Sequence, residues 1–316
     1  MGWNCRGWGW AAEQIVGIDV VTADGNSVHC NETVNSDLFW SARGSGPGFF
    51  GVVTQFHLQS RPLPAGMLAS TYVWDISEYD AVMPWVIETS RIADPNIEIV
   101  ALALYPDNSE HAPMDQRLNL VVHLLTFNDS ADAARKSLGV FSATVPRKDA
   151  ALVVDEYAVT SIAKEVVDQY KQSPEGHRYT ADNVWLHSHL PTSQVVDAIR
   201  NVFISLPSVQ TFTLYFNMAP ERPLPDMALS LQTEHYLAVY CIWKDSKDDD
   251  KYQRWMRSRF EEMEEFSPGV YLGDSDFQVR KAEFLAPGRR QKLEAVRKVW
   301  DPKGLFCSYL GLEKEE

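Results

Sequence analysis

The stretch that decides the fold runs from residue 35 to residue 54 and reads NSDLFWSARGSGPGFFGVVT. Its first part predicts a short helix over Ser36 to Arg43, because Asn35 or Ser36 can cap that helix and its apolar side chains share one face. A glycine-rich loop follows, and the alternating residues from Val52 to Leu58 predict a strand. The stretch therefore predicts a glycine-rich turn between a helix and a strand.

A second glycine-rich segment, GWNCRGWGW, occupies residues 2–10. It precedes a buried strand predicted over Ile15 to Val21, which the turn at residues 23–26 closes. Glycine lets the main chain approach a diphosphate or a flat ring closely, and its N–H groups can point at phosphate oxygens. The alternative is that each glycine cluster is an ordinary turn. Because no GxGxxG spacing follows a strand, the sequence does not predict a nicotinamide site.

The pattern changes after Arg61-Pro62-Leu63-Pro64, a segment that can continue neither a ladder nor a helix. Predicted strands beyond it cover Met67 to Trp74, Ile97 to Tyr105, Leu118 to Phe127, Arg178 to His189, Thr211 to Asn217 and Leu229 to Trp243. Predicted helices cover Tyr79 to Ile92, Ala131 to Phe141, Ser161 to Lys171, Ser193 to Ile204, Lys251 to Phe266 and Pro287 to Trp300. One-sided alternation in several strands predicts an antiparallel sheet with helices on one face, so the predicted fold class is α+β. The other face either lines a ligand or is simply exposed to solvent.

Composition disfavours several classes of protein. The 316 residues carry a net charge of −14, which disfavours binding to nucleic-acid phosphates. No apolar run approaches the roughly 18 residues that cross a bilayer, and no basic and apolar leader follows Met1, so neither a membrane segment nor a signal peptide is predicted. The four cysteines lack metal-ligand spacing, and the absence of G-x-S-x-G argues against a serine hydrolase. The compartment stays open.

Two segments together resemble the vanillyl-alcohol-oxidase and berberine-bridge-enzyme type of FAD-linked oxidoreductase. The first, residues 2–58, contains G-W-N-x-R-x-x-G, then D-V-V-T-A-D-G, then N-S-D-L-F-W-S-A-R-G-S-G-P-G-F-F-G-V-V-T. The second is L-E-A-V-R-K-V-W-D-P-K-G-L-F at residues 293–306, which is similar to the family's helix and Asp-Pro segment near the C-terminus. Together the two segments cover about a quarter of the chain.

The resemblance implies FAD as cofactor and a particular domain organisation. Residues 1–62 correspond to the C-terminal portion of a PCMH-type FAD-binding domain, residues 63–275 to a substrate domain, and residues 276–316 to a segment that returns to the FAD-binding domain. The family's R-S-G-G-H type loop is absent, and Arg289 stands where the family usually has Asn, so we expect an N-terminally truncated member. The cofactor contacts that the resemblance implies fall on Gly2, Asn4, Gly7, Val21, Gly51 and Val52.

In the family, the substrate-domain sheet lies over the flavin and supplies a base near the substrate's reacting hydrogen. In this chain the predicted catalytic groups are Glu234, Tyr215 and His187. Each could instead be a solvated side chain or one satisfied by a neighbour. His187 and His189 share a strand face and so could form a metal pair, but no third ligand follows from the sequence, and no metal site is predicted.

The sequence therefore predicts an FAD-dependent oxidoreductase that acts on a small organic substrate, such as a secondary metabolite, a sugar or an alcohol, with molecular oxygen as acceptor. Two other functions remain open. The chain could be a non-redox fragment or a substrate-domain binding module without flavin, or it could be a cyclase that uses the pocket without net redox change.

Overall fold

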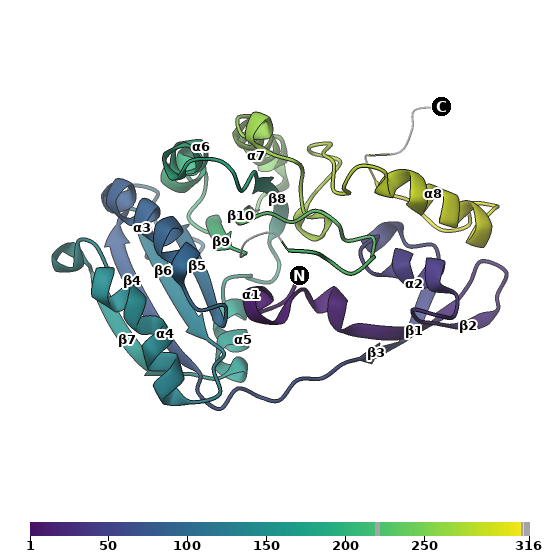
Figure 1. The fold of residues 1–316 in the computed structure, drawn as a ribbon. Coiled ribbons are helices and arrows are strands. Elements are labelled where there is room, and N and C mark those ends of the chain that lie inside the picture. Colours follow the sequence, from purple (N-terminus) through teal and green to yellow (C-terminus); the bar gives the residue numbers. More distant parts are fainter. Residues whose placement is uncertain (219–221, 311, 313–316) are drawn as a thin grey trace.

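The protein contains two antiparallel sheets, which Figure 1 shows side by side in a computed structural model that describes residues 1–218, 222–310 and 312. The small sheet has the strand order β2-β1-β3, and the large sheet has the order β7-β4-β6-β5-β9-β10-β8. The predicted α+β class, with an antiparallel sheet backed by helices, is confirmed.

The elements follow the predicted pattern closely. The strands are β1 (Ile15–Val21), β2 (Ser27–Cys30), β3 (Val52–Leu58), β4 (Leu68–Asp75), β5 (Ile97–Leu104), β6 (Asn119–Thr126), β7 (Val153–Val159), β8 (Arg178–Leu186), β9 (Phe212–Asn217) and β10 (His235–Trp243). The α-helices are α1 (Cys5–Trp8), α2 (Ser36–Ala42), α3 (Tyr79–Ile92), α4 (Ala131–Thr144), α5 (Ile162–Tyr170), α6 (Thr192–Ile204), α7 (Asp249–Glu261) and α8 (Arg289–Trp300). None of these helices is long and apolar enough to cross a membrane.

Helices α3, α4, α6 and α7 cover one face of the large sheet and share its main core. The alternation of the strands decides which side chains enter this core, because successive residues of a strand point to opposite faces. On β10, Leu237, Val239 and Cys241 face the helices. Tyr236 and Ala238 belong to a separate apolar cluster on the other face, which we call the open face.

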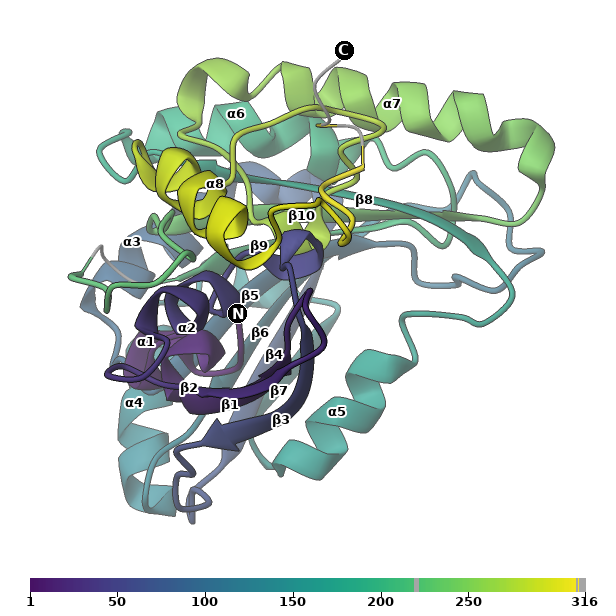
Figure 2. The same ribbon diagram turned by 90° about the vertical axis from the view of Figure 1, so that its right-hand side faces the viewer.

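The N-terminal segment, residues 1–14, lies across the open face, and Figure 2 shows α1 and the small sheet in front of the large sheet. Cys5 and Trp10 share the open-face apolar cluster with residues of β8 and β10. The thiol of Cys5 lies 3.2 Å from the sulfur of Met218, just beyond β9. This segment therefore connects the small sheet to the face that the helices leave uncovered.

The small sheet packs on α2 and α8 around a second core. Trp300 at the end of α8 donates an indole hydrogen bond of 3.0 Å to Asp37 of α2. The same core also takes Ala228, Val270 and Leu272 from the chain between the two ends. The division at residues 62 and 275 stays a prediction.

Among the helices, α1 was not predicted, and α7 ends at Glu261 rather than at Phe266. Four strands also differ from the predictions. Strands β2 and β7 were not predicted. Strand β10 begins at His235 rather than at Leu229, because Leu229 leaves the sheet and donates its N–H to the carbonyl of Arg43 at 2.8 Å. Strand β8 ends at Leu186 rather than at His189, because the His187 N–H turns away to the carbonyl of Phe266.

Candidate functional site

Aromatic side chains from β8, β9 and β10 form the floor of the open face. The ring centroids of Trp185 and Tyr236 are 4.7 Å apart, and Phe216 lies 6.4 Å from Tyr236. Trp10 of the N-terminal segment meets Trp185 edge-on at 6.0 Å. Flat, rigid rings of this kind hold a planar ligand by offset or edge-on contacts. Trp185, Tyr236 and Trp10 are each at most 3% exposed, whereas Phe216 is half-buried, so Phe216 is the ring of this set that a ligand can meet.

A carboxylate orients two phenols of this face. Tyr236 donates a hydrogen bond of 2.6 Å to Asp274, and Tyr240 lies against the same carboxylate. Burial, together with the charge of Asp274, raises the pKa of both phenols, so both carry their proton at neutral pH. Tyr236, Tyr240 and Asp274 were not among the predicted catalytic residues. The sequence of β10 does place the two tyrosines on one face, because Tyr236, Ala238 and Tyr240 alternate with the apolar residues of the opposite face.

A polar cluster lies at the rim of the large sheet, where β9 ends and β10 begins. Glu234 accepts hydrogen bonds of 3.2 Å from Arg91 of α3 and from the amide of Asn217. Arg6 of α1 donates to the amide oxygen of Asn217 and, at 2.9 Å, to the carbonyl of Ser90. The Glu234 side chain keeps 11% of its surface exposed, so this predicted residue can meet a small molecule at the rim.

Tyr215 lies directly behind this cluster and has no exposed surface. Its hydroxyl is 2.7 Å from Nδ1 of His235, and Nε2 of His235 is 3.8 Å from the Glu234 carboxylate. Burial lowers the pKa of His235 to about 4, so the imidazole is neutral at neutral pH. Because the Tyr215 ring faces the helix-covered core, this predicted residue meets the rim indirectly, through its neighbours His235 and Asn217.

His187 belongs to the turn that follows β8. Its ring lies 5.0 Å from the ring of His189. The neighbouring Ser188 hydroxyl accepts a hydrogen bond of 2.9 Å from the Glu234 N–H, which places this turn beside the rim cluster. The structure thus brings the three predicted catalytic residues to one edge of the sheet. His187 and His189 are absent from the His, Cys, Asp and Glu groups of metal-binding geometry among the described residues.

The predicted cofactor residues fall into two groups, and Gly2, Asn4 and Gly7 form the first. Asn4 is fully buried in a left-handed backbone conformation and donates its N–H to Glu98 of β5 at 2.8 Å. A Cβ atom at Gly7 would lie 2.4 Å from the side-chain oxygen of Asn96. These residues dock α1 closely on the open face.

Glu98 makes this docking pH-dependent. Burial raises the pKa of Glu98 to about 7, so its folded-state pKa lies above the value of about 4.5 in the unfolded chain. The free energy of unfolding is then highest below pH 4.5 for this group and falls as the pH rises through 7. We expect Glu98→Gln to leave stability near pH 5 almost unchanged and to raise it at pH 8, by up to about 3 kcal/mol. Urea unfolding at both pH values measures this, and equal effects at the two values would contradict it.

Val21, Gly51 and Val52 form the second group, at one end of the small sheet. Val21 of β1 is paired with Val52 of β3, and a Cβ atom at Gly51 would lie 2.6 Å from a methyl group of Val20. Val52 is 54% exposed. The assignment of both groups to FAD stays a prediction.

Several buried donors suit the oxygens of a flavin nucleotide. Among the described residues, Nε of Arg6, Nε1 of Trp10 and Nε of Arg43 are buried without a hydrogen-bond partner. Phosphate and carbonyl oxygens accept from such groups. The glycines are different, since a Cβ atom at Gly44 or Gly48 would collide with Leu229 or Tyr309 of the chain itself. Each of these donors can therefore meet an oxygen of FAD, whereas Gly44 and Gly48 leave no open cradle for its diphosphate.

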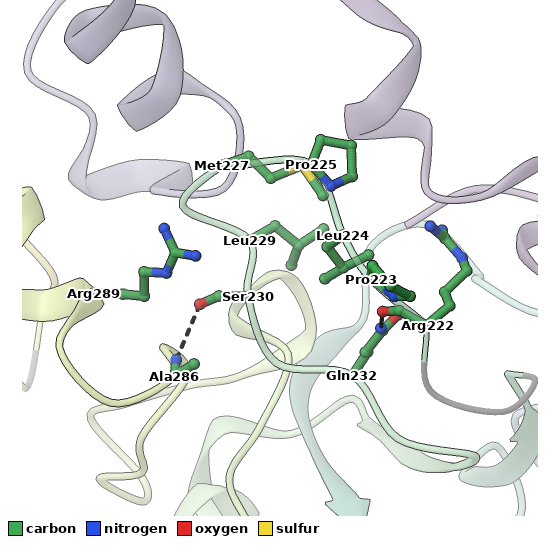
Figure 3. Close-up of a pocket in the computed structure, with 10 residues that line it drawn as sticks. All are labelled: Arg222, Pro223, Leu224, Pro225, Met227, Leu229, Ser230, Gln232, Ala286 and Arg289. Carbon is green, nitrogen blue, oxygen red and sulfur yellow. Dashed lines mark hydrogen bonds between the residues drawn. The ribbon is translucent and has the colours of Figure 1, made fainter.

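A cavity of about 430 Å³ lies between the loop that joins β9 to β10 and the start of α8 (Figure 3). Ser230 in its wall accepts a hydrogen bond of 3.0 Å from the N–H of Ala286. Two cations at the cavity are already paired, Arg222 with Glu13 and Arg289 with Asp226. Arg289, which stands where the family usually has Asn, therefore serves here as an ion-pair partner.

Comparison with known proteins agrees with this architecture. No family model matches the chain. It is 33% identical to the FAD-linked oxidoreductase ptmO of Penicillium ochrochloron over 314 residues, which are 98% of this chain and 67% of that protein. The fold matches 6-hydroxy-D-nicotine oxidase from Arthrobacter nicotinovorans with a TM-score of 0.79 at 20% identity, covering all of this chain and 69% of that one. A chitooligosaccharide oxidase matches with a TM-score of 0.75 at 19% identity, over 100% of this chain and 69% of the other.

The chain thus spans about two thirds of the length of these relatives, and the curated likeness extends over nearly all of it. The matched region includes both the glycine-rich segment at residues 2–10 and the C-terminal helix that ends at Asp301-Pro302. The chain belongs to the FAD-linked oxidoreductases of the vanillyl-alcohol-oxidase and berberine-bridge-enzyme-like family, FAD-dependent enzymes that act on small organic substrates.

Proposed function

We propose that the chain forms the substrate side of a flavin-dependent oxidase that dehydrogenates a ring-containing secondary metabolite, with molecular oxygen as the final acceptor. The substrate would lie against the half-buried ring of Phe216, with its reacting carbon toward the rim cluster. Two relatives in fold act on ring compounds, one on 6-hydroxy-D-nicotine and the other on chitooligosaccharides.

The observation that carries the proposal is a line of three titratable groups that ends at the rim. Tyr215, His235 and Glu234 follow one another at 2.7 and 3.8 Å, and only Glu234 has exposed surface. Glu234 would take the proton from the substrate's hydroxyl or amine, while Tyr215 would act through His235 and Asn217, as a positioning residue. His187 would stand beside Glu234 and bind the substrate's polar group.

The reaction removes two hydrogens from a carbon and its attached oxygen or nitrogen, which leaves a double bond between them. Bound FAD supplies the two-electron acceptor for this chemistry. Oxygen takes up the two electrons and two protons as hydrogen peroxide, so atoms and charge balance. The side chains of this chain orient the substrate and move one proton.

The first measurement is the visible spectrum of the purified chain, which should show bound flavin. Oxygen consumption and peroxide release are then measured with 6-hydroxy-D-nicotine and chitooligosaccharides as probes. Glu234→Gln should lower kcat by about 10² to 10⁴-fold and leave the flavin spectrum intact. Glu88→Gln is the matched control, because Glu88 also pairs with Arg91, at 3.1 Å, but is 57% exposed.

Tyr215→Phe separates a positioning role from a purely structural one, because it should shift the pH profile of kcat more than KM. A folded, colourless protein would overturn the proposal for this polypeptide and favour the non-redox binding module. Retained turnover in Glu234→Gln would overturn the assignment of the base alone.

A further inference from the structure

Two histidines and an aspartate converge on the outer face of the small sheet. Asp19 lies on the central strand β1, His29 on β2 and His57 on β3. Nδ1 of His29 is 2.7 Å from one oxygen of the Asp19 carboxylate, and Nε2 of His57 is 3.0 Å from the other. The ligand atoms of the three side chains all lie within 4.8 Å of one another.

The sheet itself fixes this arrangement. Ile18 and Val20 are fully buried against α2 and α8, so the intervening Asp19 must point to the opposite face. Asp19 and His29 are directly paired across β1 and β2, and His57 is paired with Gly17. Backbone pairing therefore holds the three ligands in place without any loop.

Gly17 forms the floor of the cluster. A Cβ atom there would lie 3.3 Å from Cε1 of His29 and 3.5 Å from Cδ2 of His57, so both rings occupy the space above a residue without a side chain. The two rings meet edge-on, with centroids 5.3 Å apart. All three side chains keep between a third and a half of their surface exposed, so an ion can enter from solvent.

We propose that Asp19, His29 and His57 bind one divalent transition-metal ion, with Zn²⁺ as the preferred occupant. Two imidazoles and a carboxylate form a three-ligand set that leaves a further position for water. Zn²⁺ accepts this nitrogen and oxygen set in a tetrahedral arrangement, whereas Mg²⁺ and Ca²⁺ favour oxygen ligands alone.

The ligands are far apart in sequence, which is why no spacing motif reveals them. Asp19 and His29 are separated by 10 residues, and Asp19 and His57 by 38. Only the order β2-β1-β3 brings them together. The site shares no residue with the rim cluster, because its three ligands all lie on the small sheet.

A substitution at Asn31 can change the metal affinity of the site without removing a ligand. Its amide nitrogen lies 3.2 Å from Nε2 of His29, the ring nitrogen that would not hold the metal. An amide N–H there favours the proton on Nδ1, where the metal would bind. Asn31→Asp places a carboxylate oxygen at that position, which would accept from Nε2–H and free Nδ1. A carboxylate behind a metal-bound histidine commonly changes metal affinity by about 10–100-fold.

The test titrates the metal-free chain with ZnCl₂ by calorimetry and with CoCl₂ by visible absorption, which reports a tetrahedral nitrogen and oxygen site. Wild type should bind one equivalent. His29→Ala, His57→Ala and Asp19→Asn should each weaken binding at least about 10-fold, and Asn31→Asp should tighten it by about that factor. His111→Ala, at an exposed histidine elsewhere, should leave the affinity unchanged.

Circular dichroism of each variant separates loss of the site from loss of the fold. The double variant His187→Ala/His189→Ala tests the other histidine pair. Absence of zinc binding in the folded wild type, binding that survives His29→Ala and His57→Ala, or binding lost in the His187 and His189 variant would each overturn the proposal.

Discussion

Replacing Arg280 by methionine is expected to lower the free energy of unfolding by about 3–5 kcal/mol. Arg280 and Asp182 of β8 form a bidentate pair with distances of 2.6 and 2.9 Å, and their side chains are only 7% and 4% exposed. Arg280 also donates to the carbonyl of Asn183 at 3.0 Å. Methionine fills the space but leaves the Asp182 carboxylate buried without its cation, and an unpaired buried charge is strongly destabilising.

Two companion variants show whether the pair behaves in this way. Adding Asp182→Leu to Arg280→Met should recover much of the loss, because an apolar pair of similar volume often replaces a buried ion pair at little cost. Arg254→Met should change the free energy of unfolding by less than about 0.5 kcal/mol. Arg254 is exposed, and its ion pair with Asp250 is long, at 3.9 Å. Chemical denaturation of the four proteins measures these differences. An Arg280→Met loss no larger than that of Arg254→Met would contradict the structure.

The pH dependence gives an independent check on the same variant. Burial raises the pKa of Asp182 above its ordinary value even with Arg280 present. Without Arg280 the carboxyl takes up a proton still more easily, which removes the unpaired charge. The destabilisation by Arg280→Met should therefore shrink as the pH falls toward 4.

The elements that the sequence predicted well are those whose local pattern and tertiary role agree. Strands β1 and β3 and helix α3 have the predicted ranges, because strong alternation or a long apolar stripe marks each of them. Strand β7 was missed because it is an edge strand whose apolar residues Val153, Val154 and Val159 are exposed, so no one-sided burial pattern distinguishes it. Strand β2 has only four residues, and its partner β1 determines its conformation.

The candidate site was only partly predictable for a different reason. Alternation shows that Tyr215 and its neighbour Phe216 point to opposite faces, but it does not say which face the helices cover. Long-range packing decides that, and it turns Tyr215 toward the helices. The contact between Arg91 and Glu234 joins residues 143 positions apart, so no local pattern contains it. Glu234 was predicted because it alternates with apolar neighbours, as a strand residue that faces a cavity does.

Replacing Gly44 by alanine is expected to destabilise the protein by about 3 kcal/mol or more. Gly44 has a φ of +132°, which disfavours any residue with a side chain, and a Cβ atom there would lie 2.0 Å from the backbone nitrogen of Leu229. That nitrogen donates to the carbonyl of Arg43 at 2.8 Å. The collision is with backbone rather than with a flexible side chain, so the loop before β10 must detach from the end of α2.

Two alanine substitutions separate the possible causes of that loss. Gly25 has a φ of +82°, and no atom lies within 4 Å of the place that an added Cβ would take. Gly25→Ala should therefore lower the free energy of unfolding by only about 1 kcal/mol, from backbone conformation alone. Gly139→Ala lies within α4 in open space and should stabilise by about 0.5–1 kcal/mol. Thermal and urea unfolding of the three variants measure the series.

The excess loss of Gly44→Ala over Gly25→Ala isolates the contact between the glycine-rich loop and the segment that leads into β10. This contact ties the small sheet, with the predicted cofactor residues Val21, Gly51 and Val52, to the strand that follows Glu234. A Gly44→Ala loss equal to that of Gly25→Ala would mean that the two parts are not packed together in solution. A large excess would mean that the glycines of residues 44–48 serve close packing of the two sheets, and that a flavin nucleotide must find its open space beside them.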